Sequence, residues 1–264
     1  MMEREIEGIV LSTSEYREHD GLLTILTEED KKIRFVARGI QKITSKNAGA
    51  LLIGAQSLFL LQMRERGDLH TLKHAKIKQY RRRISMSLLK QAMVSFYCEM
   101  MLKNDDIAGG YALLKSALDD LDKNDDCFTA ACVFVNQLCL AQGIAPWVDG
   151  CISCGRNDHI TTLSLRQGGF VCTDCIDRLR EVPWTRKQLQ RFRYLCHAKM
   201  NQLDELRAYD QYGLEDLKQI FAFFNEYSGV NIKGFSFLQQ VAEMEEKRSK
   251  RRDVKDMNST KTIF

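Results

Sequence analysis

The chain has 264 residues, enough for one large or two modest domains, and a formal net charge of +4. Residues 1–20 show no basic segment followed by an apolar core, and the longest apolar stretches, such as residues 50–55, fall far short of the roughly 18 residues that cross a bilayer. We therefore expect a soluble cytoplasmic protein rather than a secreted or membrane one, and in the cytoplasm thiols stay reduced and disulfides are rare.

The charge is unevenly distributed along the chain. Residues 1–30 contain two basic and nine acidic side chains, whereas residues 31–83 contain fourteen basic and two acidic ones, a local balance of +12. This basic block, rather than the total charge, is the informative quantity. Its density favours a nucleic-acid partner over a merely solvated basic face.

The first 80 residues alternate between apolar and polar side chains in the manner of β-strands. Turns and one longer connection separate five such runs, which cover residues 5–12, 21–28, 32–39, 55–64 and 70–79. Five short strands in this length match an OB-type Greek-key barrel. We therefore predict an α+β protein that begins with a five-stranded OB-type β-barrel over residues 1–80, and we interpret Phe35 and Phe59 as core residues of that barrel.

Cationic side chains recur on the predicted barrel and just beyond its end. The alternation places Arg34 and Arg38 on one face of the third strand, and Lys76 and Lys78 on one face of the fifth. Such a surface can follow the phosphates of a nucleic-acid strand. The predicted DNA-binding residues are Arg34, Arg38, Lys42, Lys46, Arg64, Arg66, Lys76, Lys78, Arg81, Arg82 and Arg83.

After the barrel the apolar period changes from two to 3.6, which predicts an all-helical domain over residues 81–243. Thr185 and Gln188 fit a capping box that begins one helix. The other predicted helices cover residues 84–103, 108–123, 127–143, 213–229 and 235–246. The composition then becomes charged and polar, and we expect a disordered tail over residues 244–264.

Two Cys-x-x-Cys pairs lie within the helical domain. They are Cys151/Cys154 and Cys172/Cys175, separated by seventeen residues. A thioredoxin-like redox motif would be a single pair within a βαβ pattern, which is missing here. The spacing fits tetrahedral zinc better. Gly155 supplies the backbone freedom that a tight turn after the first pair needs, and a short hairpin joins the two pairs.

The number of cysteines indicates a structural rather than a catalytic zinc ion. Four thiolates complete a tetrahedron and leave no position for water. We interpret His159, the nearest rival ligand, as a solvated loop residue. We therefore predict one structural Zn²⁺ per chain, in a lobe at about residues 148–180 inserted between the third and fourth helices. The sequence carries no phosphate-binding loop and no metalloprotease or hydrolase motif, so we predict that the protein is not an enzyme.

The order of these parts resembles a known family. The segments EGIVLSTSEYREHDGLLTILTEED, FVARGIQKITSKNAGAL and FAFFNEYSGVNIKGFSFL, together with the four-cysteine lobe, are similar to the bacterial recombination-mediator family RecO across residues 1–243. The resemblance implies a nucleoid-associated DNA repair protein that binds single- and double-stranded DNA and anneals complementary strands. With RecR, such a protein helps to load RecA onto DNA coated by single-stranded-DNA-binding protein.

The resemblance also implies that the helical domain receives the acidic, apolar C-terminal tail of single-stranded-DNA-binding protein. This tail needs an apolar pocket and a cation for its carboxylate. Residues 84–98 and 185–199 supply both, so we expect Lys90, Arg191 and Arg193 as partner-binding cations, although core packing is the alternative role for their apolar neighbours. Two other functions stay open: a zinc-stapled transcription or RNA-binding module, and an enzyme with an unrecognised site.

Overall fold

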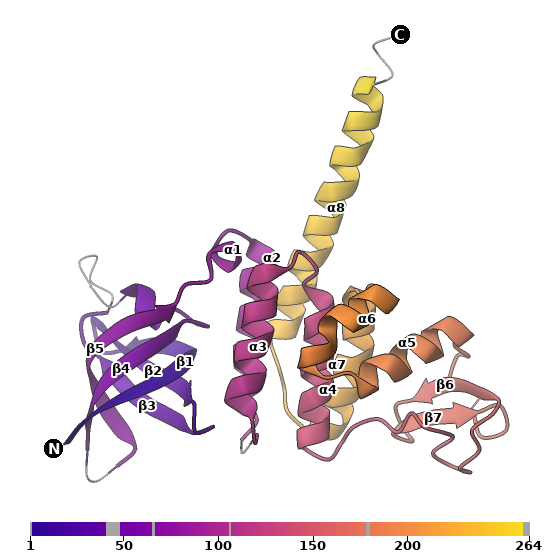
Figure 1. The fold of residues 1–264 in the computed structure, drawn as a ribbon, viewed down its shortest axis with the longest axis horizontal. Helices are drawn as coiled ribbons and strands as arrows, with labels where there is room; N and C mark the ends of the chain where they lie inside the picture. Colours follow the sequence, from indigo (N-terminus) through magenta and orange to yellow (C-terminus); the bar gives the residue numbers. More distant parts are fainter. Residues whose placement is uncertain (1, 41–47, 65–66, 106, 178–179, 261–264) are drawn as a thin grey trace. The chain divides into compact units, whose positions relative to one another are not determined.

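The computed structural model describes residues 2–40, 48–64, 67–105, 107–177 and 180–260, the last twelve by their backbone alone (Figure 1). Its contacts divide the chain into two compact units. The barrel unit consists of Met1–Ile25, Arg34–Leu102 and Ile232–Phe264, and the helical unit consists of Leu26–Ile33 and Lys103–Asn231. None of the helices in the described ranges is both long and apolar enough to span a membrane.

Five strands form a closed barrel in the order β1-β2-β3-β5-β4. They are β1 (Met2–Tyr16), β2 (Asp20–Thr27), β3 (Lys32–Ala37), β4 (Gln56–Met63) and β5 (Leu69–Gln79). β4 pairs with β1 and β5 in antiparallel fashion, whereas β3 and β5 run parallel, with Arg34 opposite Leu69. This Greek-key order confirms the predicted OB-type barrel.

The core of the barrel is built from the inward-facing residues of alternating strand positions. Ile9, Leu23, Phe35, Phe59 and Leu61 are all fully buried. The rings of Phe35 and Phe59 lie 5.5 Å apart between centroids, which confirms that both are core residues rather than stacking platforms. Burial of each such side chain stabilises the barrel by roughly 2 kcal/mol.

The barrel unit also contains helical elements that lie within or follow the barrel sequence, together with the C-terminal helix. They are a 3₁₀ turn η1 (Ala48–Leu51), α1 (Arg82–Ser85), α2 (Leu88–Lys103) and α8 (Gly234–Thr260). α1 and α2 are separate elements where we predicted one helix over residues 84–103. The carboxylate of Glu99 in α2 accepts hydrogen bonds from the backbone N–H groups of Lys233 (3.0 Å) and Gly234 (2.6 Å), so it supplies negative charge at the positive end of α8.

The C-terminal segment differs from the expected disordered tail. α8 does not end near residue 246 but continues to Thr260. The segment after residue 244 is rich in glutamate, lysine and arginine, which have high helix propensity even where they bury little apolar surface. The low apolar content of this segment indicates that it forms no packed core, but it does not exclude a helical backbone.

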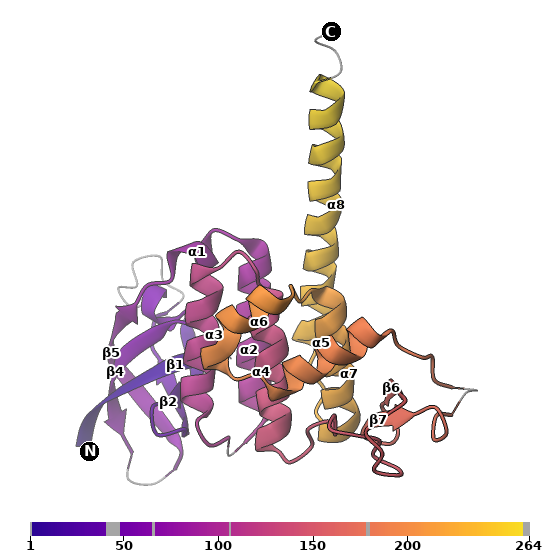
Figure 2. The ribbon, with the colours of Figure 1, turned by 45° about the vertical axis from the view of Figure 1, so that its right-hand side comes forward.

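The helical unit is organised around α4, which is buried on nearly all sides, as its continuous apolar sequence requires. Its elements are α3 (Gly110–Lys123), α4 (Phe128–Ala141), α5 (Arg186–His197), η2 (Met200–Gln202), α6 (Leu203–Tyr209) and α7 (Leu214–Ser228), with the strands β6 (Ile160–Ser164) and β7 (Gly169–Cys172). α7 packs along α4 (Figure 2). Thr185 and Gln188 form the predicted capping box at the start of α5.

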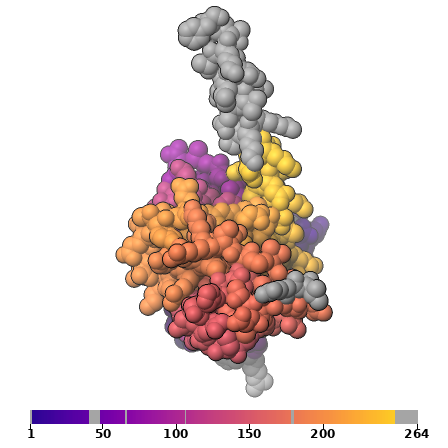
Figure 3. Space-filling model, turned by 90° about the vertical axis from the view of Figure 1, so that its right-hand side faces the viewer, coloured from indigo at the N-terminus to yellow at the C-terminus, as the bar shows by residue number. Residues whose placement is uncertain are grey.

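The four-cysteine lobe lies in the helical unit, between α4 and α5. β6 and β7 pair as the predicted antiparallel hairpin, with Gly168 in the left-handed region (φ +85°) at its turn. Phe170 of β7 packs on Phe192 of α5, with 6.0 Å between the ring centroids. The lobe and helices α5–α7 share one surface of this unit (Figure 3).

Candidate metal centre and nucleic-acid interface

The structure brings the four predicted metal ligands together. The Sγ atoms of Cys151, Cys154, Cys172 and Cys175 all lie within 4.8 Å of one another, and those of Cys154 and Cys172 are 3.7 Å apart. Tetrahedral zinc with Zn–S bonds of about 2.3 Å holds its sulfur atoms about 3.8 Å apart. The cluster could therefore hold one metal ion with only small side-chain movements.

Local backbone geometry explains how residues twenty-four positions apart meet at one point. In the first turn, the Gly155 N–H donates to the Cys151 carbonyl (2.8 Å), and Gly155 adopts φ +76°, which favours glycine. In the second turn, the Cys175 N–H donates to the Cys172 carbonyl (3.1 Å). The β6–β7 hairpin then places the second turn beside the first.

The four thiols differ in how readily they ionise: the pKa values of Cys151 and Cys172 are lowered, and those of Cys154 and Cys175 are raised. Burial of the Cys151 thiol would raise its pKa, but backbone hydrogen bonds from Cys172, Cys154 and Ser153 outweigh this and lower the pKa to about 6. The hydrogen bonds that Cys175 shares with Cys172 and Cys154 have the opposite effect and raise its pKa to about 12. Since four thiolates at this separation repel one another strongly, a bound cation is what allows all four to ionise.

His159 lies outside the group of potential ligands. Its side chain is 68% exposed, and its Nε2 atom lies 3.8 Å from a carboxylate oxygen of Asp158. The interpretation of this histidine as a loop residue is therefore confirmed. Arg156, which follows the first Cys-x-x-Cys pair, forms ion pairs with Asp158 and Asp174.

Most of the described cations predicted to bind DNA are exposed. Arg34 lies on β3 opposite Leu69 of the parallel neighbour β5, Arg38 follows the end of β3, and Lys76 lies further along β5; all three side chains are exposed. Lys78 also faces outward, but it pairs with the carboxylate of Glu7. The exposed members of the predicted set are Arg34, Arg38, Arg64, Lys76, Lys78, Arg82 and Arg83, while Lys42, Lys46 and Arg66 lie outside the described residues.

Arg81 contradicts the prediction that it contacts DNA. Its residue is only 8% exposed, and its guanidinium donates a hydrogen bond to the side-chain oxygen of Gln56 (3.0 Å). Gln56 in turn donates to the carboxylate of Glu7 (2.7 Å). Arg81 therefore holds the end of the barrel together and cannot reach phosphates.

Two of the three predicted partner-binding cations are also unavailable. Lys90 is buried, at 5% exposure. Arg191 pairs with Asp210 (2.6 Å) and Asp216 (2.7 Å), and its guanidinium lies over the ring of Tyr212. Arg191 therefore links α5 to the segment before α7 and to the first turn of α7, and a peptide carboxylate would have to displace two aspartates to bind it.

Comparison with known proteins agrees with this arrangement of a barrel followed by helices. Residues 1–81 match the family model described as Recombination protein O N terminal, and residues 87–234 match the one described as Recombination protein O C terminal. The chain belongs to the RecO family. RecO proteins act in DNA repair and recombination, which fits an exposed basic surface on an OB-type barrel.

Relatives named DNA repair protein RecO align with this chain along most of its length. It is 26% identical over 247 residues to the protein of Bacillus pumilus, covering 90% of this chain and 94% of the relative. It is 25% identical over 248 residues to that of Halalkalibacterium halodurans (92% and 97%) and 26% identical over 250 residues to that of Bacillus subtilis (90% and 94%).

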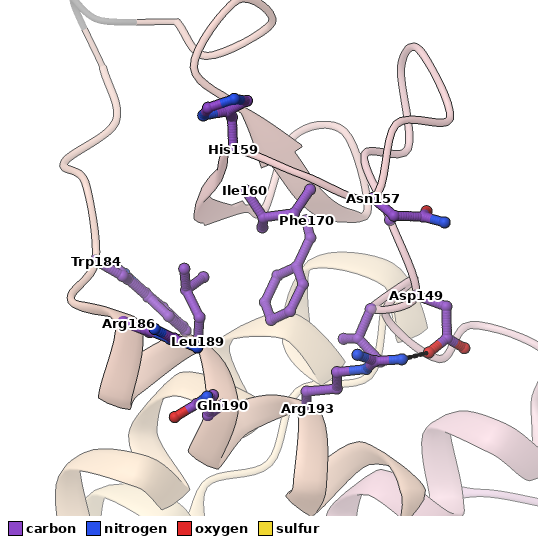
Figure 4. A pocket seen from close by; sticks show the side chains of 12 residues that line it. Asp149, Asn157, His159, Ile160, Phe170, Trp184, Arg186, Leu189, Gln190 and Arg193 are labelled. Carbon is purple, nitrogen blue, oxygen red and sulfur yellow. Dashed lines mark hydrogen bonds and ion pairs between the residues drawn. The ribbon is translucent and has the colours of Figure 1, made fainter.

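A cavity of about 730 Å³ lies between the four-cysteine lobe and α5 (Figure 4). Its walls include the apolar side chains of Ile160, Phe170, Trp184 and Leu189. Arg193, the third predicted partner-binding residue, lines this cavity and pairs with Asp149 (2.8 Å), while its own side chain stays 57% exposed. Of the three predicted cations, Arg193 alone is placed where a ligand could reach it.

Sequence reasoning missed Trp184 and Arg186, which line the same cavity. Both flank the predicted N-cap Thr185, so the predicted start of α5 was the sequence feature that could have pointed to them. Their joint placement depends on the packing of β7 against α5, which the periodicity of neither segment reveals.

Proposed function

We propose that this RecO family member acts as a stoichiometric recombination mediator. It binds single- and double-stranded DNA through the outer surface of its barrel, anneals complementary strands and, with RecR, helps to load RecA onto DNA coated by single-stranded-DNA-binding protein. Cations that neutralise phosphates on two strands lower the repulsion that opposes their pairing. We also propose that the metal of the four-cysteine lobe is zinc and that it is structural, since four thiolates leave no open position for catalysis.

The exposure of Arg34 on β3, of Arg38 just after it and of Lys76 on the neighbouring strand β5 supports the DNA-binding part of this proposal. If about five phosphates are neutralised on a single strand, log affinity falls with log salt at a slope of about −3.5. We expect an Arg34→Ser/Arg38→Ser/Lys76→Ser variant to flatten this slope by about 2, because three phosphate contacts are lost. Fluorescence anisotropy of labelled single-stranded DNA over a salt series measures the slope.

A control with the same change of charge separates a local site from a general effect of net charge. Arg166, Arg180 and Lys199 are exposed cations of the helical unit. Their triple serine variant should leave the slope nearly unchanged. Equal flattening in both variants, or an unchanged slope in the barrel variant, would refute the proposed barrel site. Preference for RNA over unrelated single-stranded DNA would instead favour the alternative transcription or RNA-binding module.

We further propose that the cavity beside α5 receives the C-terminal tail of single-stranded-DNA-binding protein. Trp184, Phe170 and Leu189 offer an apolar wall for a terminal aromatic side chain, and Arg186 and Arg193 offer cations for its carboxylate. We expect Arg186→Ser/Arg193→Ser to weaken tail-peptide binding at least about tenfold, as for the loss of charge-assisted hydrogen bonds, while affinity for naked single strands is kept.

Titration of the full-length variant with the tail peptide and with naked DNA checks this prediction. Lys187→Ser/Lys199→Ser is a suitable control, since it removes two exposed cations, one within α5 and one just after it, that do not line the cavity. Unchanged peptide affinity in the Arg186/Arg193 variant would place the tail elsewhere.

A further inference from the structure

The barrel unit has a groove of its own, more apolar than the cavity beside α5, whose described lining holds no metal ligand and, of the predicted DNA-binding residues, only the buried Arg81. Its volume is about 550 Å³, and it runs from the η1 turn and the end of β5 to α1 and α2. Large apolar side chains in its wall are unusually exposed: Tyr80 by 69%, Leu52 by 65%, Ile53 by 43% and Ile77 by 37%. A group of this kind on a folded unit marks an interaction surface.

On β5, the groove lies on a different face from the predicted DNA contacts Lys76 and Lys78. Ile77 continues the inward-facing series of this strand, which includes the buried Ala75, and it therefore sits at the mouth of the barrel. Lys76 and Lys78 alternate with it and point outward. A ligand in the groove and a strand on the outer surface would thus contact opposite faces of β5.

The lining favours a protein over DNA. Among the described residues of the wall, Arg81 is the one charged side chain, and it is held inside by its hydrogen bond to Gln56. Three of the four exposed apolar side chains of the described wall, Leu52, Ile53 and Ile77, are aliphatic, which leaves Tyr80 alone among them as an aromatic surface on which a base could stack. Exposed aliphatic side chains are instead typical of a surface that binds the apolar face of another protein segment.

The rim indicates the charge of that segment. Arg82 and Arg83 are exposed on α1, the same helix whose Ile84 and Ser85 line the groove. No acidic side chain lines the described part of the groove. A second copy of this chain would bring the same arginines together across a two-fold axis, which is unfavourable. An acidic partner satisfies both the apolar wall and the cationic rim.

We propose that this barrel-mouth groove docks a segment of a partner protein that presents apolar side chains flanked by aspartate or glutamate. The apolar side chains bury Leu52, Ile53 and Tyr80, and the acidic flanks face Arg82 and Arg83. This site is distinct from the cavity beside α5, and the exposed cations that it shares with the predicted DNA-binding set are Arg82 and Arg83.

The probe is a short amphipathic peptide with leucine on one helical face and glutamate on the other, compared with a matched peptide that carries lysine in place of glutamate. We expect the full chain to bind the glutamate peptide at least about tenfold more tightly than the lysine peptide. A Leu52→Glu/Ile53→Glu variant should lose at least about tenfold in affinity for the glutamate peptide, because it adds repulsion and removes apolar contact. Arg82→Ser/Arg83→Ser, which leaves the apolar wall intact, should weaken the same peptide and reduce its salt dependence.

The control is Leu140→Glu, which adds a charge at a half-exposed leucine of α4 in the other unit and should leave peptide affinity unchanged. Equal binding of both peptides, binding of neither, or unchanged affinity in the Leu52/Ile53 variant would overturn the proposal. Loss of single-strand affinity in that variant would make the groove a DNA site instead. A dimer in sedimentation experiments that the same variant converts to monomer would make it a self-association surface.

Discussion

A Cys151→Ser or Cys172→Ser variant is expected to be isolated without its zinc ion and to lose the fold of the four-cysteine lobe. Both residues are buried at the centre of the lobe, where their sulfur atoms lie within 4.8 Å of the other two. Metal binding at such sites contributes folding free energy on the order of 10 kcal/mol near neutral pH. Elemental analysis should find one zinc ion per wild-type chain and none per variant chain, and limited proteolysis should cleave the variants within residues 148–180.

Cys139→Ala provides the matched control, because Cys139 is a fully buried cysteine of α4 outside the cluster. This variant should keep one zinc ion and an intact lobe, with only a moderate loss of stability from the small cavity. Freshly purified, reduced wild-type protein that contains no zinc would contradict the assignment. Visible absorption from a bound cluster would indicate iron instead of zinc, since Zn²⁺ is colourless and both metals accept four thiolates.

The features that sequence predicted well are those encoded by neighbouring residues. The cysteine spacing, the glycines of the turns and the hairpin between them together bring the four cysteine side chains to one place, because each Cys-x-x-Cys pair is positioned by its own turn. The five strands were predicted for the same reason, since their alternation is local. Strand ends were less accurate: β1 spans Met2–Tyr16, although only residues 5–12 had the expected pattern.

The predictions that failed concern cations whose partners are distant in the sequence. Arg81 bonds Gln56, and Arg191 pairs with Asp210 and Asp216, so a basic residue that looked available for phosphate or carboxylate is already neutralised. Local composition cannot show such pairing. In contrast, the exposure of Arg34 and Arg38 follows directly from strand alternation, and these residues lie where the sequence predicted.

Arg207 is the clearest example of a residue that the sequence did not reveal. Its guanidinium bonds both carboxylate oxygens of Asp120 (2.6 and 3.0 Å) and one of Asp126 (2.9 Å), so it ties α6 to the end of α3 and the start of α4. The three side chains are between 12% and 21% exposed. We expect Arg207→Leu to lower the free energy of unfolding by roughly 3 kcal/mol, because two largely buried carboxylates lose their counter-charge. Urea denaturation at neutral pH measures this loss, and Arg180→Leu, at an exposed arginine, should change stability little.

Two further measurements identify the lost charge pairing as the cause of the Arg207→Leu effect. Burial of Asp126 would raise its carboxyl pKa, but hydrogen bonds from Thr129, Arg207 and the backbone hold it below its usual value. A depressed carboxyl pKa stabilises the fold above about pH 4 and loses this effect as the carboxyl is protonated, so the gap between wild type and variant should narrow as the pH falls further. In addition, the double variant Arg207→Leu/Asp120→Leu should be more stable than the single variant Arg207→Leu, because it leaves no unpaired carboxylate at position 120. In both variants Asp126 keeps its hydrogen bonds from the backbone N–H groups of Phe128 (3.0 Å) and Thr129 (3.2 Å). A double variant less stable than the single one would show that packing around Arg207, rather than its charge, holds α6 against α3 and α4.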